Sequence, residues 1–295
     1  MTQGRHTFQS DTAPLDSVLV KHARDAWRDQ ATVDAEWQSL GFTARPDFAR
    51  ALEEYEGFLS LLGRSGDIGF VFAAPDLRVG LDSLYSRDAT VATDRGVIIC
   101  NMGKAARRSE PAAMLDTLMG AGVPVLGAIE GEGTLEGGDL VWLDGRTLAV
   151  GRSYRSNYSG IEQLRGLLGD SVEVLVVDLP HWRGPADLLH LMSIVSPLDV
   201  DLALVHSPLM PIRLREALLA RGIELVEVAE QEIATQGCNV LALAPREALM
   251  VAGNPRTRDR LVRAGVRVHE FAGNEICIKG GGGPTCLTRP LRRHL

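Results

Sequence analysis

Five polar segments along the chain carry the types of side chain that do covalent chemistry. They are residues 80–88, 133–140, 187–193, 236–240 and 279–288. Three acids, a histidine and a cysteine stand out among them: Asp82, Asp88, Glu136, His190 and Cys286. A cysteine with a histidine suits covalent catalysis, because the thiolate is a nucleophile and the imidazole can protonate a leaving group and later activate water.

The acids carry information about the substrate. Carboxylates close to a thiol raise the pKa of that thiol, which opposes catalysis unless a cationic substrate offsets their charge. A planar guanidinium meets this need, since its N–H donors pair with carboxylate oxygens two at a time. The residue types therefore predict a cysteine-dependent enzyme that acts on a guanidine carbon.

A repeated unit must position these segments. It consists of an apolar strand-like run, a helical stretch, a break and a second apolar run, and it occurs five times. The predicted strand, helix and strand are residues 17–20, 47–62 and 70–72; 97–100, 111–119 and 123–126; 148–150, 160–168 and 172–177; 202–205, 211–220 and 223–228; and 248–251, 256–264 and 266–268. Each polar segment follows one unit, so pseudo-symmetry would bring all five segments to one end of a common axis, around one central site.

Composition limits the class of protein. With 45% hydrophobic and 23% charged residues in 295, the chain can bury a large core, and no apolar run approaches the roughly 20 residues of a membrane span. The polar start, residues 1–11, lacks the apolar region of a signal peptide, so we expect a cytoplasmic protein. The 38 acidic and 31 basic residues give a net charge of −7 without a basic block, which argues against nucleic acid and membrane and favours a small-molecule partner.

Metal centres of the common cysteine types are not supported. The four cysteines, Cys100, Cys238, Cys277 and Cys286, lie far apart and form no CxxC pair. Only Cys286 follows four glycines, which would allow a close approach of the backbone to a ligand. We therefore expect Cys286 to be the cysteine that carries function.

Four motifs, in order, resemble the guanidino-modifying pentein superfamily. They are DSLYSRD at 82–88, EGGD at 136–139, LHL at 189–191 and GGGGPTCL at 280–287. This superfamily includes dimethylarginine dimethylaminohydrolases, arginine deiminases and amidinotransferases. The resemblance covers nearly the whole chain. It implies a five-bladed α/β propeller with the site on its axis, in agreement with the five repeats.

The resemblance also implies roles for the catalytic groups. Cys286 resembles the nucleophile and His190 the general acid and base. Asp88 and Glu136 resemble the carboxylates that hold the guanidinium, and Asp82 a further acid that binds substrate.

Three arginines are candidates for the amino-acid end of the substrate. Arg107 or Arg108, and Arg155, are similar to the arginines that bind the substrate carboxylate in the dimethylarginine hydrolases. The reaction implied by the resemblance passes through a thiouronium intermediate on the cysteine, ends in a ureido product, and requires no metal and no cofactor.

Two positions depart from the pattern and bear on the substrate. Arg87 occupies a position that is commonly acidic in the dimethylarginine hydrolases, and Met192 one that is Asp in the deiminases and Lys in the dimethylarginine hydrolases. Loss of that Asp weakens a plain arginine deiminase interpretation, and an apolar Met192 near the pocket would favour a methylated guanidine. We therefore expect hydrolysis of N-methylated arginine, with arginine deiminase or dihydrolase, amidinotransferase and a non-enzymatic binding pentein as alternatives.

The domain organisation follows from the repeats. Modules of this size cannot bury a core alone, so residues 1–295 are expected to form one domain. An insertion at 24–46 interrupts the first unit and could cover the pocket, whose mouth His181 and Trp182 could line. Homo-oligomer formation is left open.

Overall fold

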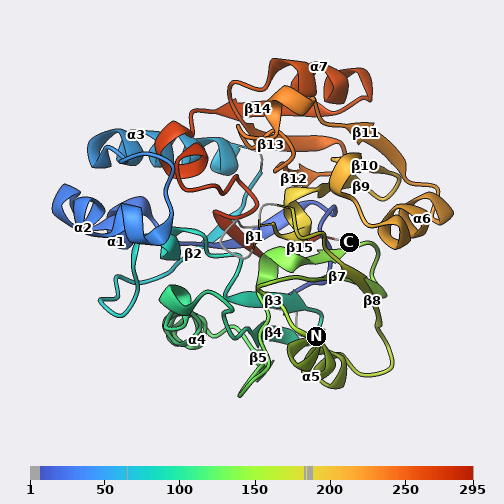
Figure 1. Cartoon of the computed structure of the whole chain (residues 1–295), viewed down its shortest axis with the longest axis horizontal. Coiled ribbons are helices and arrows are strands. Elements are labelled where there is room, and N and C mark those ends of the chain that lie inside the picture. The colour runs from blue at the N-terminus through green and yellow to red at the C-terminus, as the bar shows by residue number, and fades with distance from the viewer. Residues whose placement is uncertain (1–6, 65, 183, 185–188, 295) are drawn as a thin grey trace.

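The computed structural model describes residues 7–64, 66–182, 184 and 189–294. The start of the polar N-terminal segment, residues 1–6, and Asp187 and Leu188 of the third polar segment lie outside the described residues. Within the described part, the strands form five three-stranded sheets. Figure 1 shows the sheets grouped about the middle of the molecule, with the helices on the outside.

All five sheets have the same plan, in which a central strand pairs parallel with the strand that follows it and antiparallel with a third. The central strands are β1 (Leu15–Val20), β4 (Gly96–Ile99), β7 (Thr147–Arg152), β10 (Leu202–Val205) and β13 (Glu247–Val251). Their parallel partners are β2 (Gly69–Phe72), β5 (Val125–Ala128), β8 (Glu173–Asp178), β11 (Glu224–Glu227) and β14 (Arg267–Phe271). The antiparallel partners are β15 (Thr288–Arg293), β3 (Thr90–Thr93), β6 (Leu140–Trp142), β9 (Val195–Asp199) and β12 (Leu241–Ala244).

A helix connects the two parallel strands of each sheet, because a parallel pair needs a long crossover. These helices are α3 (Phe48–Arg64), α4 (Glu110–Gly120), α5 (Tyr158–Leu168), α6 (Ile212–Ala220) and α7 (Pro255–Arg263). The five predicted strand–helix–strand units are thus confirmed to within a few residues at each end.

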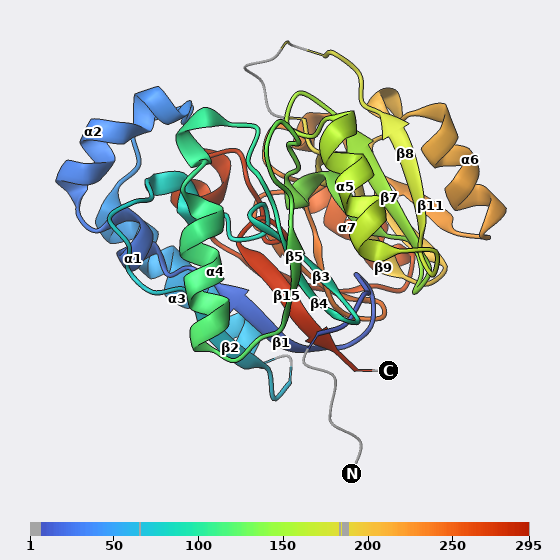
Figure 2. The same ribbon diagram turned by 90° about the horizontal axis from the view of Figure 1, so that it is seen from below.

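The antiparallel strand of each sheet was not predicted. Most of these strands are short and begin directly after a polar segment, so their apolar residues do not form a separate run. The first sheet takes β15 from the C-terminal end of the chain, and Figure 2 shows β1 and β15 side by side. The last polar segment is thereby joined to the first sheet, and the chain closes on itself.

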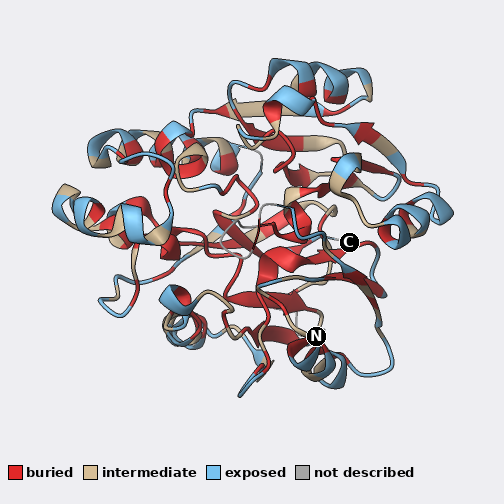
Figure 3. Cartoon of the chain, viewed as in Figure 1, coloured by how far each residue is buried: buried red, intermediate tan, exposed pale blue. Residues whose placement is uncertain are grey.

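Central strands supply much of the core. Every residue of β4 and β10 is buried, and apolar clusters fill the space between sheets and helices, as the red interior of Figure 3 shows. No helix in the described part of the chain has the length and apolar character needed to span a membrane.

The insertion in the first unit contains α1 (Ala23–Trp27) and α2 (Gln30–Leu40). Buried Trp27 donates its indole N–H to the Leu81 carbonyl at 3.2 Å, and the Leu81 N–H donates to Glu36 at 3.0 Å. At the other end the Thr43 N–H donates to the Lys279 carbonyl at 2.8 Å. The insertion is therefore packed against the first and last polar segments.

Candidate active site

Three polar segments bring together a group that we call the histidine cluster, Asp88, Glu136 and His190. One carboxylate oxygen from each acid and one ring nitrogen of the histidine lie within 4.8 Å of one another, and all three residues are buried. His190 Nε2 lies 2.8 Å from Glu136 Oε2, and His190 Nδ1 lies 3.7 Å from Asp88 Oδ1. The imidazole is thus held between two carboxylates.

Backbone contacts fix this cluster in place. The Gly138 N–H donates to Asp88 Oδ1 at 3.0 Å, and a Cβ at this glycine would collide with the His190 ring, so only glycine fits. Asp139 accepts from the Leu191 N–H at 3.1 Å and from the Ser153 and Ser156 hydroxyls at 2.6 and 2.8 Å. Asp139 therefore anchors the residue next to His190.

The carboxylates control the charge of His190. Burial alone would lower the pKa of the imidazole, but Asp88, Asp139 and Glu136 raise the pKa to about 9. Although burial disfavours their ionised forms, the charge of His190 holds the pKa of Asp88 and Glu136 below their usual values. His190 is therefore an imidazolium at neutral pH, and it carries a proton that it can donate.

A second group, the cysteine cluster, consists of Asn239, Thr285 and Cys286. Asn239 Nδ2 lies 3.2 Å from Cys286 Sγ, and Asn239 Oδ1 accepts from the Thr285 N–H at 3.0 Å and the Thr285 hydroxyl at 2.7 Å. A Cβ at Gly283 would stand 2.6 Å from the Asn239 amide, so glycine lets this loop close over the asparagine. The glycines before Cys286 thus permit close approach to other side chains of the site.

Cys286 differs from the other cysteines in exposure. Cys100, Cys238 and Cys277 are buried, whereas Cys286 is only partly buried. Burial and the negative charge of Asp88 raise the pKa of the Cys286 thiol, while hydrogen bonds from Asn239, Gly283 and Thr285 act in the opposite direction. In the free protein Cys286 is therefore a neutral thiol.

Arg87 joins the two clusters. Its N–H donates to the Cys286 carbonyl at 3.2 Å, and its Nε donates to the Thr285 carbonyl at 3.0 Å. Its guanidinium is buried against Asp11, 3.3 Å away. The residue that departs from the family pattern thus braces the cysteine loop beside Asp88, rather than pointing at a substrate.

The three candidate arginines have different surroundings. Arg107 is buried, and it donates to Asp88 at 2.6 Å and to both oxygens of Glu110 at 2.8 and 2.9 Å. Of the two alternatives predicted for the substrate carboxylate, Arg107 or Arg108, Arg107 is thus already paired with two buried carboxylates of the protein. Arg108 is exposed, and Arg155 lies 3.8 Å from Glu136.

Asp82 lies at the side of the site that is next to the insertion. Lys104 Nζ lies 2.6 Å from Asp82 Oδ2 and 2.7 Å from the Leu40 carbonyl at the end of α2. The Lys104 N–H also donates to Glu136 Oε1 at 3.0 Å. Lys104 therefore connects Asp82, the insertion and the histidine cluster, a link that no sequence motif indicated.

Two hollows lie at opposite ends of the strands. One, of about 260 Å³, adjoins the site and is lined by Arg152, Ser153, Tyr154, Arg155, Leu179, Pro180, His181 and Leu189. Its lining includes His181, as the sequence suggested, and Tyr154, whose hydroxyl lies 2.5 Å from His181 Nδ1.

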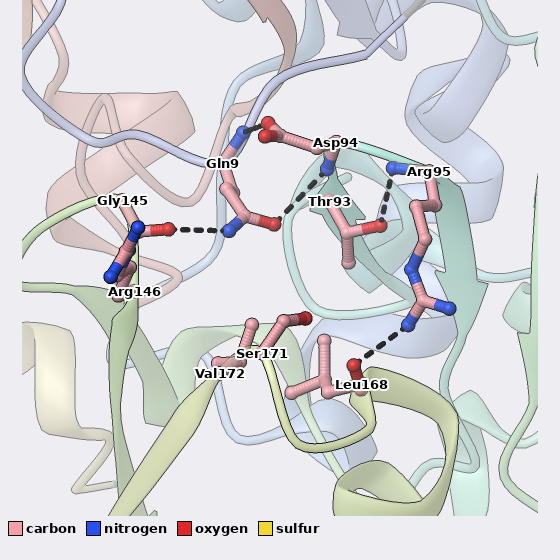
Figure 4. A pocket seen from close by; sticks show the side chains of 9 residues that line it. All are labelled: Gln9, Thr93, Asp94, Arg95, Gly145, Arg146, Leu168, Ser171 and Val172. Atoms are coloured by element: carbon pink, nitrogen blue, oxygen red, sulfur yellow. Dashed lines mark hydrogen bonds between the residues drawn. The ribbon is translucent and has the colours of Figure 1, made fainter.

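The other hollow, of about 290 Å³, lies at the hairpin ends of β3 and β6, away from the ends that carry Asp88 and Asp139 (Figure 4). Gln9 spans it, pairing with Asp94 and with the Gly145 carbonyl, and Arg95 donates to the Leu168 carbonyl. None of the predicted site residues lines it, so the hollow beside Arg155 is the one associated with the site.

Geometry alone would allow the histidine cluster to hold a metal ion. However, a metal needs neutral imidazole and unpaired carboxylate oxygens, whereas His190 is protonated and Arg107 pairs with Asp88. The arrangement is therefore better described as an ion-pair network that can bind and protonate an organic substrate.

Comparison with known proteins identifies the family. A model of the family described as "N,N dimethylarginine dimethylhydrolase, eukaryotic" matches residues 28–293. The chain belongs to this family. Dimethylarginine dimethylaminohydrolases of Streptomyces coelicolor and Pseudomonas aeruginosa are 30% and 27% identical, the alignment spanning 83% of this chain and 88% and 89% of theirs.

Solved structures agree with this assignment. The fold matches a mutant of the Pseudomonas aeruginosa enzyme complexed with citrulline, with a TM-score of 0.75, 25% identity, and coverage of 93% of this chain and 98% of that one. An amidinotransferase from Microseira wollei matches with a TM-score of 0.79 at 18% identity, over 98% of each chain, which shows the shared fold alone. The predicted pentein superfamily is confirmed.

The position of one residue, Met192, differs from the expectation that it lies near the pocket. Met192 is 2% exposed and packs in the apolar cluster that contains Val141 and Val205, so it belongs to the core of the family fold. Its apolar character therefore reflects packing, and it does not support a preference for methylated guanidines. Asn239 lies in the polar segment predicted for the fourth unit, where either bracing a loop or touching substrate was expected. Its contact with Cys286 and the contacts of Lys104 were not predicted, because they join segments far apart in sequence.

Proposed function

We propose that this protein hydrolyses N-methylated arginine, converting dimethylarginine to citrulline and dimethylamine through a covalent intermediate on Cys286. The observation that carries the proposal is the imidazolium of His190 held between two carboxylates, beside a neutral thiol that repels no cation. Family membership and the relatives named above support it. Hydrolysis of unmethylated arginine and amidino transfer are the alternatives within the same superfamily.

The guanidinium is bound by the carboxylates. Glu136, Asp88 and Asp82 supply negative charge on one side of the thiol, and oxygen lone pairs beyond those used by His190, Arg107 and Lys104 accept its N–H groups. Binding of the cation offsets the charge of Asp88, lowers the pKa of Cys286 and releases the thiol proton to solvent.

The first half of the reaction forms the intermediate. The Cys286 thiolate attacks the guanidinium carbon, and an S–C bond forms. His190 gives its proton to the substituted nitrogen, the C–N bond breaks, and the amine leaves. The products of this half are a thiouronium cation on Cys286 and a neutral imidazole.

The second half regenerates the enzyme. Neutral His190 takes a proton from water as the oxygen adds to the same carbon, and the S–C bond then breaks. The remaining oxygen-bound proton is lost, which leaves the ureido group of citrulline, and the Cys286 thiolate takes up a proton as the product leaves. The released amine takes up a proton from solvent.

The amino-acid end of the substrate lies toward the hollow beside the site. Arg155 is the arginine that both borders the hollow and approaches Glu136, so we assign it to the substrate carboxylate. Exposed Arg108 is the second candidate. Arg107 holds Asp88 in place instead.

The architecture supports a single site. We propose that the five sheets are the blades of one propeller formed by a single domain, residues 1–295, and that the insertion at 24–46 covers the Asp82 side. The common sheet plan and the contacts of the insertion with Leu81 and Lys279 support this arrangement.

The test is a substrate panel. Purified protein is incubated separately with asymmetric dimethylarginine, monomethylarginine, arginine and agmatine, and with arginine plus glycine, and the products are identified by mass spectrometry, with Cys286→Ser as the control. We expect citrulline and dimethylamine from dimethylarginine. Citrulline or ornithine from arginine alone would replace the proposal with deiminase or dihydrolase activity, and guanidinoacetate would indicate amidino transfer. No turnover of any guanidine would overturn the enzymatic function.

A further inference from the structure

The cysteine cluster contains one side-chain amide whose orientation is fixed by its chemistry. Asn239 is 4% exposed and comes from the polar segment of the fourth unit. Its Oδ1 accepts from the Thr285 N–H and the Thr285 hydroxyl. The opposite orientation would set the NH2 group against a backbone N–H that can only donate, so the NH2 group must face Cys286.

Thr285 cannot replace this donor. Its single hydroxyl hydrogen is used in the 2.7 Å bond to Asn239, and its oxygen lies 3.9 Å from Cys286 Sγ. Asn239 Nδ2 lies 3.2 Å from Cys286 Sγ and is closer to the sulfur than the Thr285 hydroxyl oxygen is. It is neutral, so it stabilises a thiolate without repelling a bound cation.

We propose that Asn239 is a catalytic residue that donates a hydrogen bond to Cys286 Sγ and stabilises the thiolate that attacks the substrate. The inference rests on the proposed function only for the identity of the electrophile. Nearby Asp88 opposes formation of the thiolate, and the Asn239 bond acts against this effect. The same NH2 group stabilises the Cys286 thiolate that leaves when the S–C bond breaks in the second half of the reaction.

The test is the titration of Cys286 in Asn239→Ala. The rate of iodoacetamide labelling of Cys286 is measured from pH 6 to 10 by mass spectrometry of peptides, with Cys286→Ser to verify the labelled position. We expect the pKa of Cys286 to be higher in the variant than in wild type, and the rate of labelling at pH 7.5 to fall about tenfold or more. Loss of one preorganised donor is expected to lower kcat by about 10²-fold, with KM within a few-fold of wild type.

A second variant guards against a failure to fold. Asn239→Asp keeps the size of the side chain and the acceptor for Thr285 but replaces the donor that faces the sulfur, and the same direction of change is expected. A folded variant in which Cys286 titrates as in wild type would overturn the proposal, as would a large rise in KM with kcat unchanged. Labelling needs no turnover, so the result for Asn239 stands even if dimethylarginine proves not to be the substrate.

Discussion

The histidine cluster and the cysteine cluster hold their central side chains in different ways. His190 is held by full charges, with carboxylates on both sides and Arg107 behind Asp88. Cys286 is held by neutral groups, an amide and a loop closed by glycine. The histidine cluster stores a proton on His190, whereas burial and the charge of Asp88 keep the Cys286 thiol protonated until a cation arrives.

This difference explains how the site can hold a nucleophile beside several carboxylates. Ion pairs fix the protonation of His190 over a wide pH range, because removing its proton would leave buried carboxylates unpaired. Weak neutral contacts leave the pKa of Cys286 sensitive to the charge of the substrate. Predictions can test each cluster separately.

The largest effect on kcat is expected from a substitution in the cysteine cluster. Cys286→Ser should lower kcat by about 10⁴-fold or more, because the hydroxyl is a far weaker nucleophile at neutral pH. The change is nearly isosteric, so the thermal unfolding midpoint should change little. Cys238→Ala, in a separate apolar cluster, is the matched control and should keep its kcat. Activity within a hundredfold of wild type in Cys286→Ser would contradict the assignment of the nucleophile.

In the histidine cluster, His190→Gln should lower kcat by about 10²- to 10⁴-fold, because no group would then protonate the leaving amine. In wild type, kcat should fall as the pH rises through about 9, where His190 loses its proton. Steady-state kinetics across pH 6 to 10 measure both effects. A kcat that stays constant through pH 10 would argue against this acid.

The same histidine should make stability depend on pH. Its pKa is about 9 in the folded protein and about 6.5 when unfolded, so the folded state binds the proton more tightly. This contribution is complete below pH 6.5 and is lost as the pH rises through about 9. Urea unfolding at several pH values should show the decline in wild type and a smaller one in His190→Gln. Equal slopes would mean that the histidine cluster does not stabilise the imidazolium.

Adjacent arginines provide a matched pair for the next effect. Arg107→Met leaves Asp88 and Glu110 without their buried partner and should cost about 3–5 kcal/mol in the free energy of unfolding. Arg108→Met, one residue along and exposed, should change that free energy little. Chemical denaturation compares the two. Similar losses in both would refute the distinction between a buried positioning arginine and an exposed one.

The smallest effect is expected at Arg155, which lies between the histidine cluster and the hollow beside the site. Arg155→Gln should raise KM for dimethylarginine about tenfold, equivalent to roughly 1.4 kcal/mol of binding, with kcat changed only a few-fold. Inhibition by agmatine, which lacks the carboxylate, should be unaffected. If the binding of agmatine and of dimethylarginine weakens by the same factor, Arg155 acts on the guanidinium end of the substrate instead.

The repeat and the candidate catalytic residues could be predicted from the sequence alone. Apolar runs and helical stretches recur with the same order in all five units, and local patterning of this kind fixes secondary structure. Glycines beside Glu136 and before Cys286 marked the points where the backbone comes close to other atoms. Motif order then indicated the superfamily that the comparisons confirm.

Only the tertiary structure decided which charged residues face the substrate and which hold one another. Arg107 and Arg108 are neighbours in one motif, yet burial pairs one with Asp88 and leaves the other exposed. Likewise, Asn239 and Lys104 gain their roles from contacts with segments 22 to 64 residues away in sequence. The physical reason is that a hydrogen bond or ion pair depends on distance in space, and this distance is set when the sheets assemble around the site.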